Sequence, residues 1–224
     1  MVKKTGKPSA RKTSVDKRVK MNRAQRCRQI AGVRKKQITR AAYEVIAEKG
    51  YYNFTMMDIA KRAGVSSGLI HHYFKDKENM LVTLLREMQQ DVRAKLEKAT
   101  ENLTDPRQKL DIFMDQAFGL VDSDREYAYV IFDFLTQVKY NDRMKRILTK
   151  LYRGYRETCE AIVKEGIEEG TFRKGTDSHF IATLVITAFL GLREQYIIDN
   201  TAFFYLEYTN KIKSSIFGMV LARK

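Results

Sequence analysis

Proline is almost absent from this chain. Only Pro8 and Pro106 occur among its 224 residues. Proline breaks helices because it lacks a backbone N–H and because its ring clashes with the preceding turn. Long uninterrupted helices are therefore allowed, and apolar residues recur at helical spacing over much of the chain. The sequence predicts an all-α fold of about nine helices.

The apolar content excludes wholesale disorder. Hydrophobic residues make up 44% of the chain and aromatic residues 11%, which is enough material for a core. The longest uncharged apolar stretch, 180–192, is shorter than the ~20 residues that a membrane helix needs, and no secretory signal is visible. Cys27 and Cys159 cannot form a disulfide framework. We therefore expect a soluble, cytoplasmic protein without a membrane-spanning segment.

Positive charge is concentrated at the start of the chain. Residues 1–36 contain 14 Lys and Arg and one acid, a net charge of +13, whereas the other residues hold 28 basic and 26 acidic side chains, a net charge of +2. A basic arm on a near-neutral body is typical of polyanion binding through phosphate neutralisation. A solvated leader, a membrane-surface anchor or an organellar transit peptide are the alternatives. We expect nucleic acid to be the partner.

Residues 1–32 form the basic segment proper, with 11 basic residues before Arg34. Few large apolar side chains occur there, so we expect a flexible arm, helical at most in part between residues 17 and 30. The arm is expected to follow the DNA backbone or to enter the minor groove, as homeodomain arms do. Met1 and Met21 are both possible starts of the native chain.

Residues 33–81 carry the signals of three short helices. The first is amphipathic and is expected to end at Gly50, in the left-handed conformation that glycine tolerates. Thr55 is the expected N-cap of a second helix over 56–63, and Asp58 suits the positive helix start.

The turn that follows the second helix has the composition of a helix-turn-helix. Gly64 permits a tight turn that a Cβ would penalise. Ser66 is the expected N-cap of a third helix over 67–74, and this helix start is also suited to a phosphate. Asp76 is the expected cap of a fourth helix that continues to about residue 101. Two short helices joined by a four-residue turn are the signature of a helix-turn-helix.

These residues also carry a resemblance to a known family. The run Thr55-x3-Ile59-Ala60-x2-Ala63-Gly64-Val65-Ser66-x-Gly68-x4-Tyr73-Phe74-x2-Lys77-x3-Leu81 resembles the N-terminal domain of the TetR/AcrR family of bacterial transcriptional regulators. The resemblance implies that the third helix enters the major groove and that nearby side chains hold phosphates. The residues that it assigns to DNA are Thr55, Ser66, Ser67, Leu69, His71, His72, Tyr73 and Lys77.

Three of these positions depart from the family pattern. The family commonly has Tyr at position 71 and often His at 73, whereas this chain has His71 and Tyr73. Leu69 replaces a frequent Thr, so it offers apolar contact to a thymine methyl but no hydrogen bond. A metal site at His71 and His72 is rejected, because neighbouring helical residues point about 100° apart.

Residues 102–224 are predicted to form a helical domain for effector binding and dimerisation. Asp105 and Pro106 mark its first helix start. The family resemblance implies a ligand pocket in this region, and large inward-facing residues at helix centres are the candidates, although each also fits an ordinary core. An apolar and aromatic lining would suit a lipophilic or amphiphilic effector. The candidates are Phe113, Phe132, Tyr155 and Phe189.

The resemblance further implies a homodimer formed by the last two helices of each subunit. Packing of these helices within one chain is the alternative. Two recognition helices related by a two-fold axis would read a near-palindrome. The residues proposed for the dimer seam are Ala182, Val185, Ile186, Phe189, Gly191, Phe204, Tyr208, Ile212, Ile216 and Met219.

The sequence therefore predicts a dimeric DNA-binding regulator, a repressor that a small molecule releases from a palindromic operator. The alternative is an architectural DNA-binding protein with weak sequence preference, dominated by the arm. No phosphate-binding loop, dinucleotide fingerprint, nucleophile elbow or zinc-protease motif is present, so neither an enzyme nor a bound cofactor or metal is expected. Cys159 is expected to be a core thiol.

Overall fold

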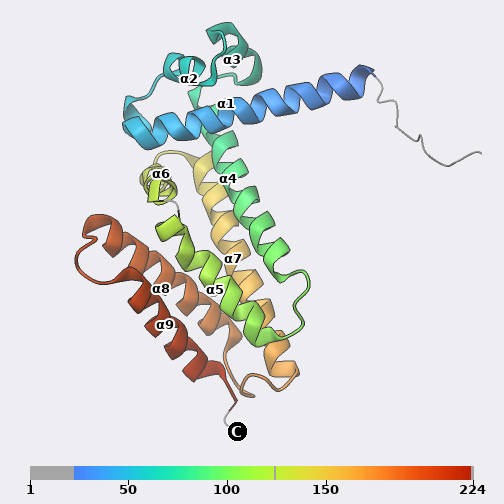
Figure 1. Ribbon diagram of the computed structural model, residues 1–224, viewed down its shortest axis with the longest axis vertical. Helices are drawn as coiled ribbons and strands as arrows, with labels where there is room; N and C mark the ends of the chain where they lie inside the picture. Colours follow the sequence, from blue (N-terminus) through green and yellow to red (C-terminus); the bar gives the residue numbers. More distant parts are fainter. Residues whose placement is uncertain (1–22, 124, 223–224) are drawn as a thin grey trace, which may run out of the picture. The chain divides into compact units, whose positions relative to one another are not determined.

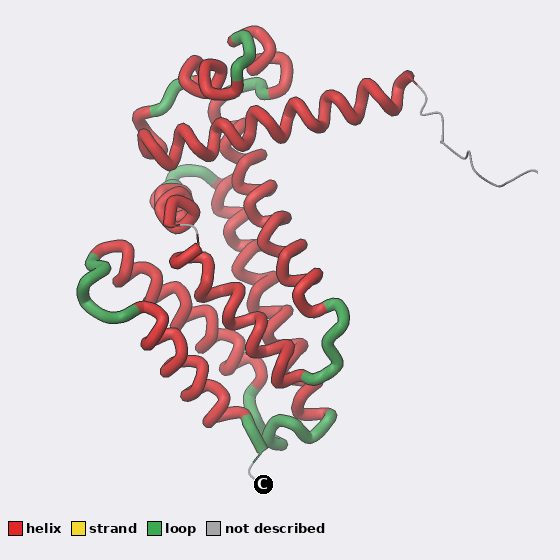
Figure 2. Tube along the Cα trace, in the orientation of Figure 1, coloured by secondary structure: helices red, strands yellow, loops and turns green. Residues whose placement is uncertain are grey.

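The computed structural model describes residues 23–123 and 125–222 of the chain. Figure 2 shows that the regular structure in this part of the chain is helical throughout, which confirms the all-α class. The helices (Figure 1) are α1 (Arg23–Asn53), α2 (Met56–Ala63), α3 (Ser67–Tyr73), α4 (Lys77–Thr100), α5 (Pro106–Ser123), α6 (Arg125–Thr136), α7 (Asp142–Glu168), α8 (Ser178–Ile198) and α9 (Tyr205–Val220).

Helix α1 begins ten residues before the predicted start of the helical region at Val33. Residues 23–32 are helical, which agrees with the expected partial helix between residues 17 and 30, and the helix continues into α1 without a break. The segment is rich in Arg, Ala and Gln, which favour helix even where no apolar face is present. The rest of the predicted arm, residues 1–22, lies outside the described residues.

The described part of the chain divides into two units, with the boundary between Lys36 and Gln37. In the second unit, α7 packs against α4, α5 and α8, and α9 packs on α8 and α5. Helix α6 contacts α5 and α8. Helix α5 is therefore the central helix of the C-terminal part, in contact with α4, α6, α7, α8 and α9 (Figure 1).

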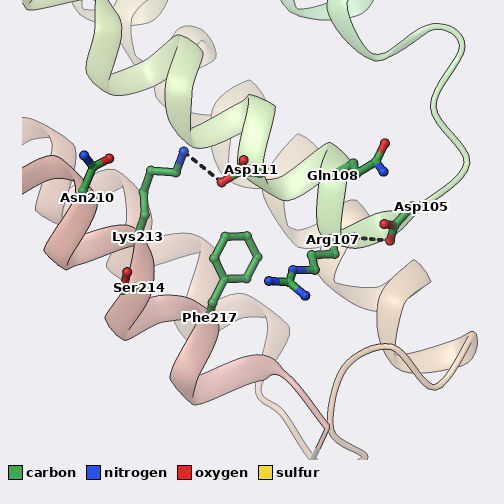
Figure 3. Close-up of a pocket in the computed structure, with 8 residues that line it drawn as sticks. All are labelled: Asp105, Arg107, Gln108, Asp111, Asn210, Lys213, Ser214 and Phe217. Carbon is green, nitrogen blue, oxygen red and sulfur yellow. Dashed lines mark hydrogen bonds and ion pairs between the residues drawn. The ribbon is translucent and has the colours of Figure 1, made fainter. Parts of the chain in front are cut away.

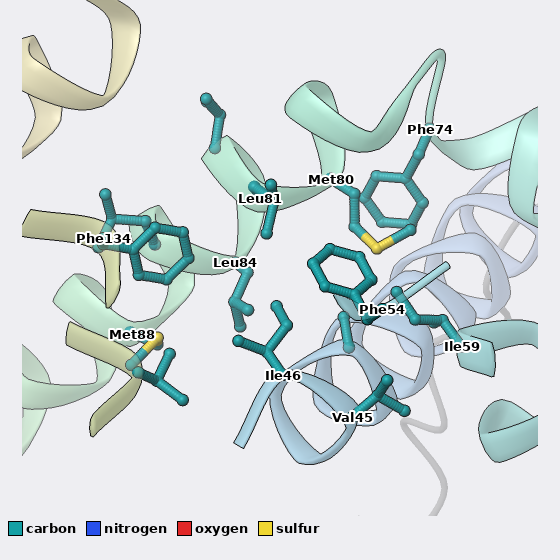
Figure 4. Close-up of a cluster of buried hydrophobic side chains, with 14 of the residues drawn as sticks. Val45, Ile46, Phe54, Ile59, Phe74, Met80, Leu81, Leu84, Met88 and Phe134 are labelled. Carbon is teal, nitrogen blue, oxygen red and sulfur yellow. The ribbon is translucent and has the colours of Figure 1, made fainter. Parts of the chain in front are cut away.

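The buried side chains of the second unit form two clusters. The first joins α2 and α3 to the start of α4, and it extends to residues of α6 and α7. Figure 4 shows part of it, with Phe54, Ile59 and Phe74 facing Met80 and Phe134 lying near Leu84. The second cluster fills the space among α5, α7, α8 and α9. The helix-turn-helix region therefore shares one core with the near ends of α4, α6 and α7.

Helix α6 also makes polar contacts with the end of α1. The backbone N–H of Tyr51 donates to Asp133 Oδ2 at 2.9 Å, and Gln137 Nε2 donates to the Tyr52 hydroxyl at 2.6 Å. Gly50 directly precedes these residues with φ 78° and ψ 165°. Its positive φ was expected, and the helical backbone is interrupted there, so the long helix ends at Gly50 as predicted. Its ψ lies outside the left-handed helical region, and residues 51–53 are a short further helical stretch that shares the label α1.

Helix α8 is long and apolar enough to cross a membrane by length and composition. Its apolar side chains nevertheless pack in the core: Ala182 and Val185 are fully buried, and Phe189 is 3% exposed. These residues belong to the second cluster with Ile186 and Ile216. The five residues were expected at the dimer seam, and the structure places them inside the chain instead, because the inward faces of α8 and α9 are covered by α5 and α7.

Candidate nucleic-acid interface and effector cavity

The start of α2 is held by a reciprocal cap, as the sequence predicts. The Thr55 hydroxyl accepts from the Asp58 N–H at 3.2 Å, while Asp58 Oδ2 accepts from the Thr55 N–H at 2.8 Å. Lys49 Nζ lies 2.7 Å from Asp58 Oδ1. Two amides that a helix start would leave without partners are thus satisfied, and the Thr55 side chain stays exposed.

The turn between α2 and α3 is built from glycine and a serine cap. Gly64 adopts φ 63° and ψ 38°, the left-handed conformation that ends α2. The Ser66 hydroxyl accepts from the Leu69 N–H at 3.3 Å at the start of α3. Ile59 and Ile70 are both fully buried, which fixes the two helices against each other as predicted.

Helix α3 therefore presents its remaining side chains away from the core. His71 and His72 are exposed, and Ser67, Leu69 and Tyr73 are half-buried. The His72 and Tyr73 rings meet edge to face, with centroids 5.3 Å apart. A short helix anchored by one buried residue, with polar and aromatic side chains on its outer faces, has the geometry of a recognition helix.

Lys77 opens α4 directly after the Asp76 cap, which accepts from the Asn79 N–H at 2.6 Å. The Lys77 amine donates to the Phe54 carbonyl at 3.1 Å and lies 3.8 Å from the centroid of the Phe54 ring. Burial lowers the pKa of this amine below its ordinary value. Because an ammonium group has three donors, contact with Phe54 leaves donors for a phosphate.

Substitutions of Thr55 test whether the cap that it forms with Asp58 stabilises the protein. Thr55→Ala removes one half of the cap, and we expect it to lower the free energy of unfolding by about 1 kcal/mol. Thr55→Ser, which keeps the hydroxyl, should have a much smaller effect. Urea unfolding of both variants at pH 7 measures the difference, and equal stability of the two would contradict the role of the cap.

The same cap predicts a pH dependence. Hydrogen bonds from Lys49, and then from Thr55, lower the pKa of Asp58 to about 2, whereas an unfolded chain would have a value near ~3.9. The stabilisation by the carboxylate is complete above that unfolded value and is lost as pH falls towards 2. Asp58→Asn should therefore make the loss of stability between pH 4 and 2 shallower than in the unmodified protein.

Three of the four predicted effector residues come together in the C-terminal part. Phe113, Tyr155 and Phe189 line one small cavity of about 20 Å³. Phe132 does not line it; this residue is half-buried on α6. No sequence pattern marks the other lining residues as effector contacts. They are Val92, Leu96, Gln116, Ala117 and Ile186.

A much larger cleft of about 1330 Å³ runs along α4 and α7. It shares Leu96 and Tyr155 with the small cavity, so these two side chains lie where the cleft and the cavity adjoin. Acidic and basic residues both line the cleft. The basic ones are Arg93, Lys109, Lys145, Arg146, Lys150 and Arg153.

A third pocket, of about 530 Å³, lies between the start of α5 and α9. Figure 3 shows Lys213 of α9 reaching towards Asp111 of α5, at 2.8 Å. Asp115 also pairs with Lys213, at 2.5 Å, and the Arg107 guanidinium lies 5.7 Å from the centre of the Phe217 ring. These contacts fasten α9 to α5, and the pocket holds none of the predicted effector residues.

Cys159 is fully buried within α7, as expected for a core thiol. Burial, with a smaller effect of Glu160, raises the pKa of its thiol to about 12. Among the side chains that the structure describes, no group of three or more His, Cys, Asp or Glu residues is placed to hold a metal ion.

Two family models match the chain. Residues 38–84 match the model of bacterial regulatory proteins of the tetR family, and residues 106–203 match the C-terminal model of BetI-type transcriptional repressors. The first match contains the helix-turn-helix, and the second contains the cavity residues Phe113, Tyr155 and Phe189. The two matches thus fall on the two regions that the geometry distinguishes.

Curated relatives and solved structures agree with these matches. The chain is 34% identical to the fatty acid metabolism regulator protein of Bacillus subtilis over 141 residues, 63% of this chain and 72% of the relative. It is 28% identical to the regulator BetI of Rhizobium meliloti over 179 residues, 74% of this chain and 88% of that protein.

The fold is likewise similar to those of solved regulators. A TetR regulator from Haloarcula marismortui superposes with a TM-score of 0.78 at 20% identity, over 85% of this chain and 100% of that one. The regulator FadR from Bacillus subtilis in complex with stearoyl-CoA superposes with a TM-score of 0.69 at 26% identity, over 80% of this chain and 96% of that one. The chain therefore belongs to the TetR family of bacterial regulatory proteins, and it is a DNA-binding transcriptional regulator.

Proposed function

We propose that this regulator is a repressor that inserts α3 into the major groove of a palindromic operator. The observation that carries the proposal is the outward face of α3, where His71 and His72 are exposed beside Leu69 and Tyr73. Ser67 completes this face. Thr55, Ser66 and Lys77 stand at the starts of α2, α3 and α4, where helix ends and cationic groups favour phosphates.

The proposed domain division is a basic arm at 1–32, a DNA-binding domain at 33–81 and an effector-binding and dimerisation domain at 102–224. We propose that the outer faces of α8 and α9 form the homodimer. Several large apolar side chains there are exposed to solvent, which is uncommon unless a partner covers them. The exposed candidates are Phe180, Ile198, Phe204, Leu206, Tyr208 and Met219.

The proposed effector is a small molecule with an apolar acyl chain. Apolar and aromatic side chains line the cavity at Phe113, Tyr155 and Phe189, and the adjoining cleft along α4 and α7 offers a route and room for a polar head group. The similar regulator from Bacillus subtilis is described in complex with stearoyl-CoA. A chain entering beside Tyr155 would push the walls of the cavity apart.

Helix α6 is the proposed connection between this cavity and the DNA-binding domain. Tyr127 of α6 hydrogen-bonds Tyr155 at the cavity wall. At the other end of α6, Asp133 accepts from the Tyr51 N–H. A shift of α6 caused by an effector would therefore be transmitted to the end of α1, since one rigid helix carries both contacts.

Selection of bound duplexes from a random pool, at ~0.15 M salt, tests the operator. We expect a palindromic motif with half-sites about one helical turn apart. Enrichment without a motif would instead support the architectural alternative, in which the arm dominates binding.

The exposed histidines of α3 allow a specific check on the recovered operator. His71→Ala with His72→Ala should weaken operator binding at least about 30-fold, because each lost base or phosphate contact costs ~1–3 kcal/mol and two are lost. His179→Ala is the matched control, since His179 is exposed on α8 and faces Glu160 at 3.1 Å. Fluorescence anisotropy with operator and scrambled duplexes measures both, and equal affinities of the two variants would contradict the assignment of α3.

A further inference from the structure

Arg193 is a buried cation whose side chain is incompletely satisfied. The residue lies on α8 and is only 4% exposed. Among the described side chains, its Nε has no hydrogen-bond partner and no carboxylate forms an ion pair with it. Burial of a charge without a counter-ion is costly, so buried charges are normally paired. The position of Arg193 therefore calls for a partner that the described part of the chain does not supply.

Arg193 lies beside the effector cavity. It is four residues beyond Phe189 and seven beyond Ile186 on α8, so the three share one helix face, and both of the others line the cavity. The Arg193 guanidinium lies 5.1 Å from the centroid of the Phe189 ring.

The charge of Arg193 also acts electrostatically on Tyr155, another residue that lines the cavity. Burial, above all, raises the pKa of its hydroxyl, and the Arg193 charge acts in the opposite direction. The positive charge of Arg193 therefore acts at the wall of a cavity whose lining is apolar except for Gln116 and the Tyr155 hydroxyl.

We propose that Arg193 binds the carboxylate of the effector, which is then a free carboxylic acid with an apolar chain. This inference rests on the proposed effector site among Phe113, Tyr155 and Phe189. A carboxylate supplies the missing counter-ion and accepts charge-assisted hydrogen bonds from a guanidinium, including Nε. A cationic effector would instead meet like charge at this point.

The cavity must open to admit such a ligand. A volume of about 20 Å³ holds roughly one water molecule. The ligand must therefore displace lining side chains, and Tyr155 and Leu96 separate the cavity from the large cleft. Pairing of the buried cation provides a favourable contribution that offsets the cost of this opening.

Three ten-carbon probes test the proposal with the full-length protein. Decanoate, 1-decanol and decanoyl-CoA share the chain length and differ in the end group. We expect decanoate to bind about 10- to 100-fold more tightly than 1-decanol in calorimetric titrations, the effect of a hydrogen bond to a charged group. Decanoate is also expected to release the protein from its operator.

Arg193→Met is the informative variant because it keeps much of the volume and removes the charge. We expect it to abolish the preference for decanoate over 1-decanol and, without ligand, to unfold at the same or a higher temperature, since a buried unpaired charge is removed. Lys164→Met, on α7, where the lysine pairs with Glu160 at 2.7 Å and lines neither the cavity nor the cleft, is the matched control and should retain the preference.

The results distinguish a failure of the Arg193 proposal from a failure of the proposed effector site. Equal binding of decanoate and 1-decanol, or an unchanged preference in Arg193→Met, overturns the role of Arg193. Binding of decanoyl-CoA alone overturns the free-acid inference and supports the acyl effector. If none of the three probes binds or releases the operator, the proposed effector site itself is wrong.

Discussion

Deletion of residues 1–32 is expected to make operator binding far less sensitive to salt. The segment holds 11 basic residues, and each phosphate contact contributes ~0.9 to the slope of log K against log salt. If about six of these side chains contact phosphates, the slope becomes shallower by about 5. Between 50 and 200 mM salt, the full-length protein would then lose roughly 1000-fold more affinity than the shortened one.

A second variant separates the effect of the positive charge of residues 1–32 from the effect of their length. A full-length variant with the 11 basic residues replaced by Gln should behave as the shortened protein does. The operator motif should stay the same in all three forms, because phosphate contacts position a protein without specifying sequence. An unchanged slope in the shortened protein would show that the arm does not contact DNA.

The helix starts and the turn of the DNA-binding region were predictable from sequence. Thr55, Ser66 and Asp76 each cap the helix that was expected of them, and Gly64 ends α2 in the left-handed conformation. Each cap or turn is determined by one residue and the few residues that adjoin it in the sequence. Local chemistry of this kind survives in any tertiary context that keeps the helix start intact.

The outer and inner faces of α8 and α9 were not predictable in the same way. Both helices are apolar on several sides, so periodicity does not show which side faces the chain's own core. Val185 and Ile216 were expected at the dimer seam and are buried within the chain, whereas Leu206 was not selected and is 67% exposed. Only the positions of α5 and α7 decide between these faces.

Arg193 was not among the predicted effector residues, although its position in the sequence is unusual. It follows Phe189 by four residues on an otherwise apolar helix face, a position where arginine is rarely placed without a partner. Conversely, three of the four aromatic candidates for effector binding line one small cavity, and their role in binding stays a prediction. Phe132 does not, because the face of α6 that carries it was not determined by the apolar pattern of that helix.

The end of α7 depends on a close approach that only glycine permits. A Cβ on Gly166 would lie 2.1 Å from Cδ2 of the Phe172 ring, and the Phe172 N–H donates to the Gly166 carbonyl at 2.8 Å. Phe172 is 1% exposed. The Arg173 N–H, next to Phe172, donates to the Val220 carbonyl at 2.8 Å. This bond holds the segment that carries the ring against the end of α9, so the ring cannot easily move away from an added Cβ.

Gly166→Ala is therefore expected to lower the free energy of unfolding by about 3 kcal/mol, the upper part of the range for overpacking. Gly154→Ala, in the same helix with no neighbouring atom within 4 Å of the added Cβ, should instead stabilise by up to ~1 kcal/mol. Thermal unfolding at one protein concentration should separate the two by about 10 °C. In a Phe172→Ala background the cost of Gly166→Ala should largely vanish; a persistent cost would place the strain elsewhere than at the ring.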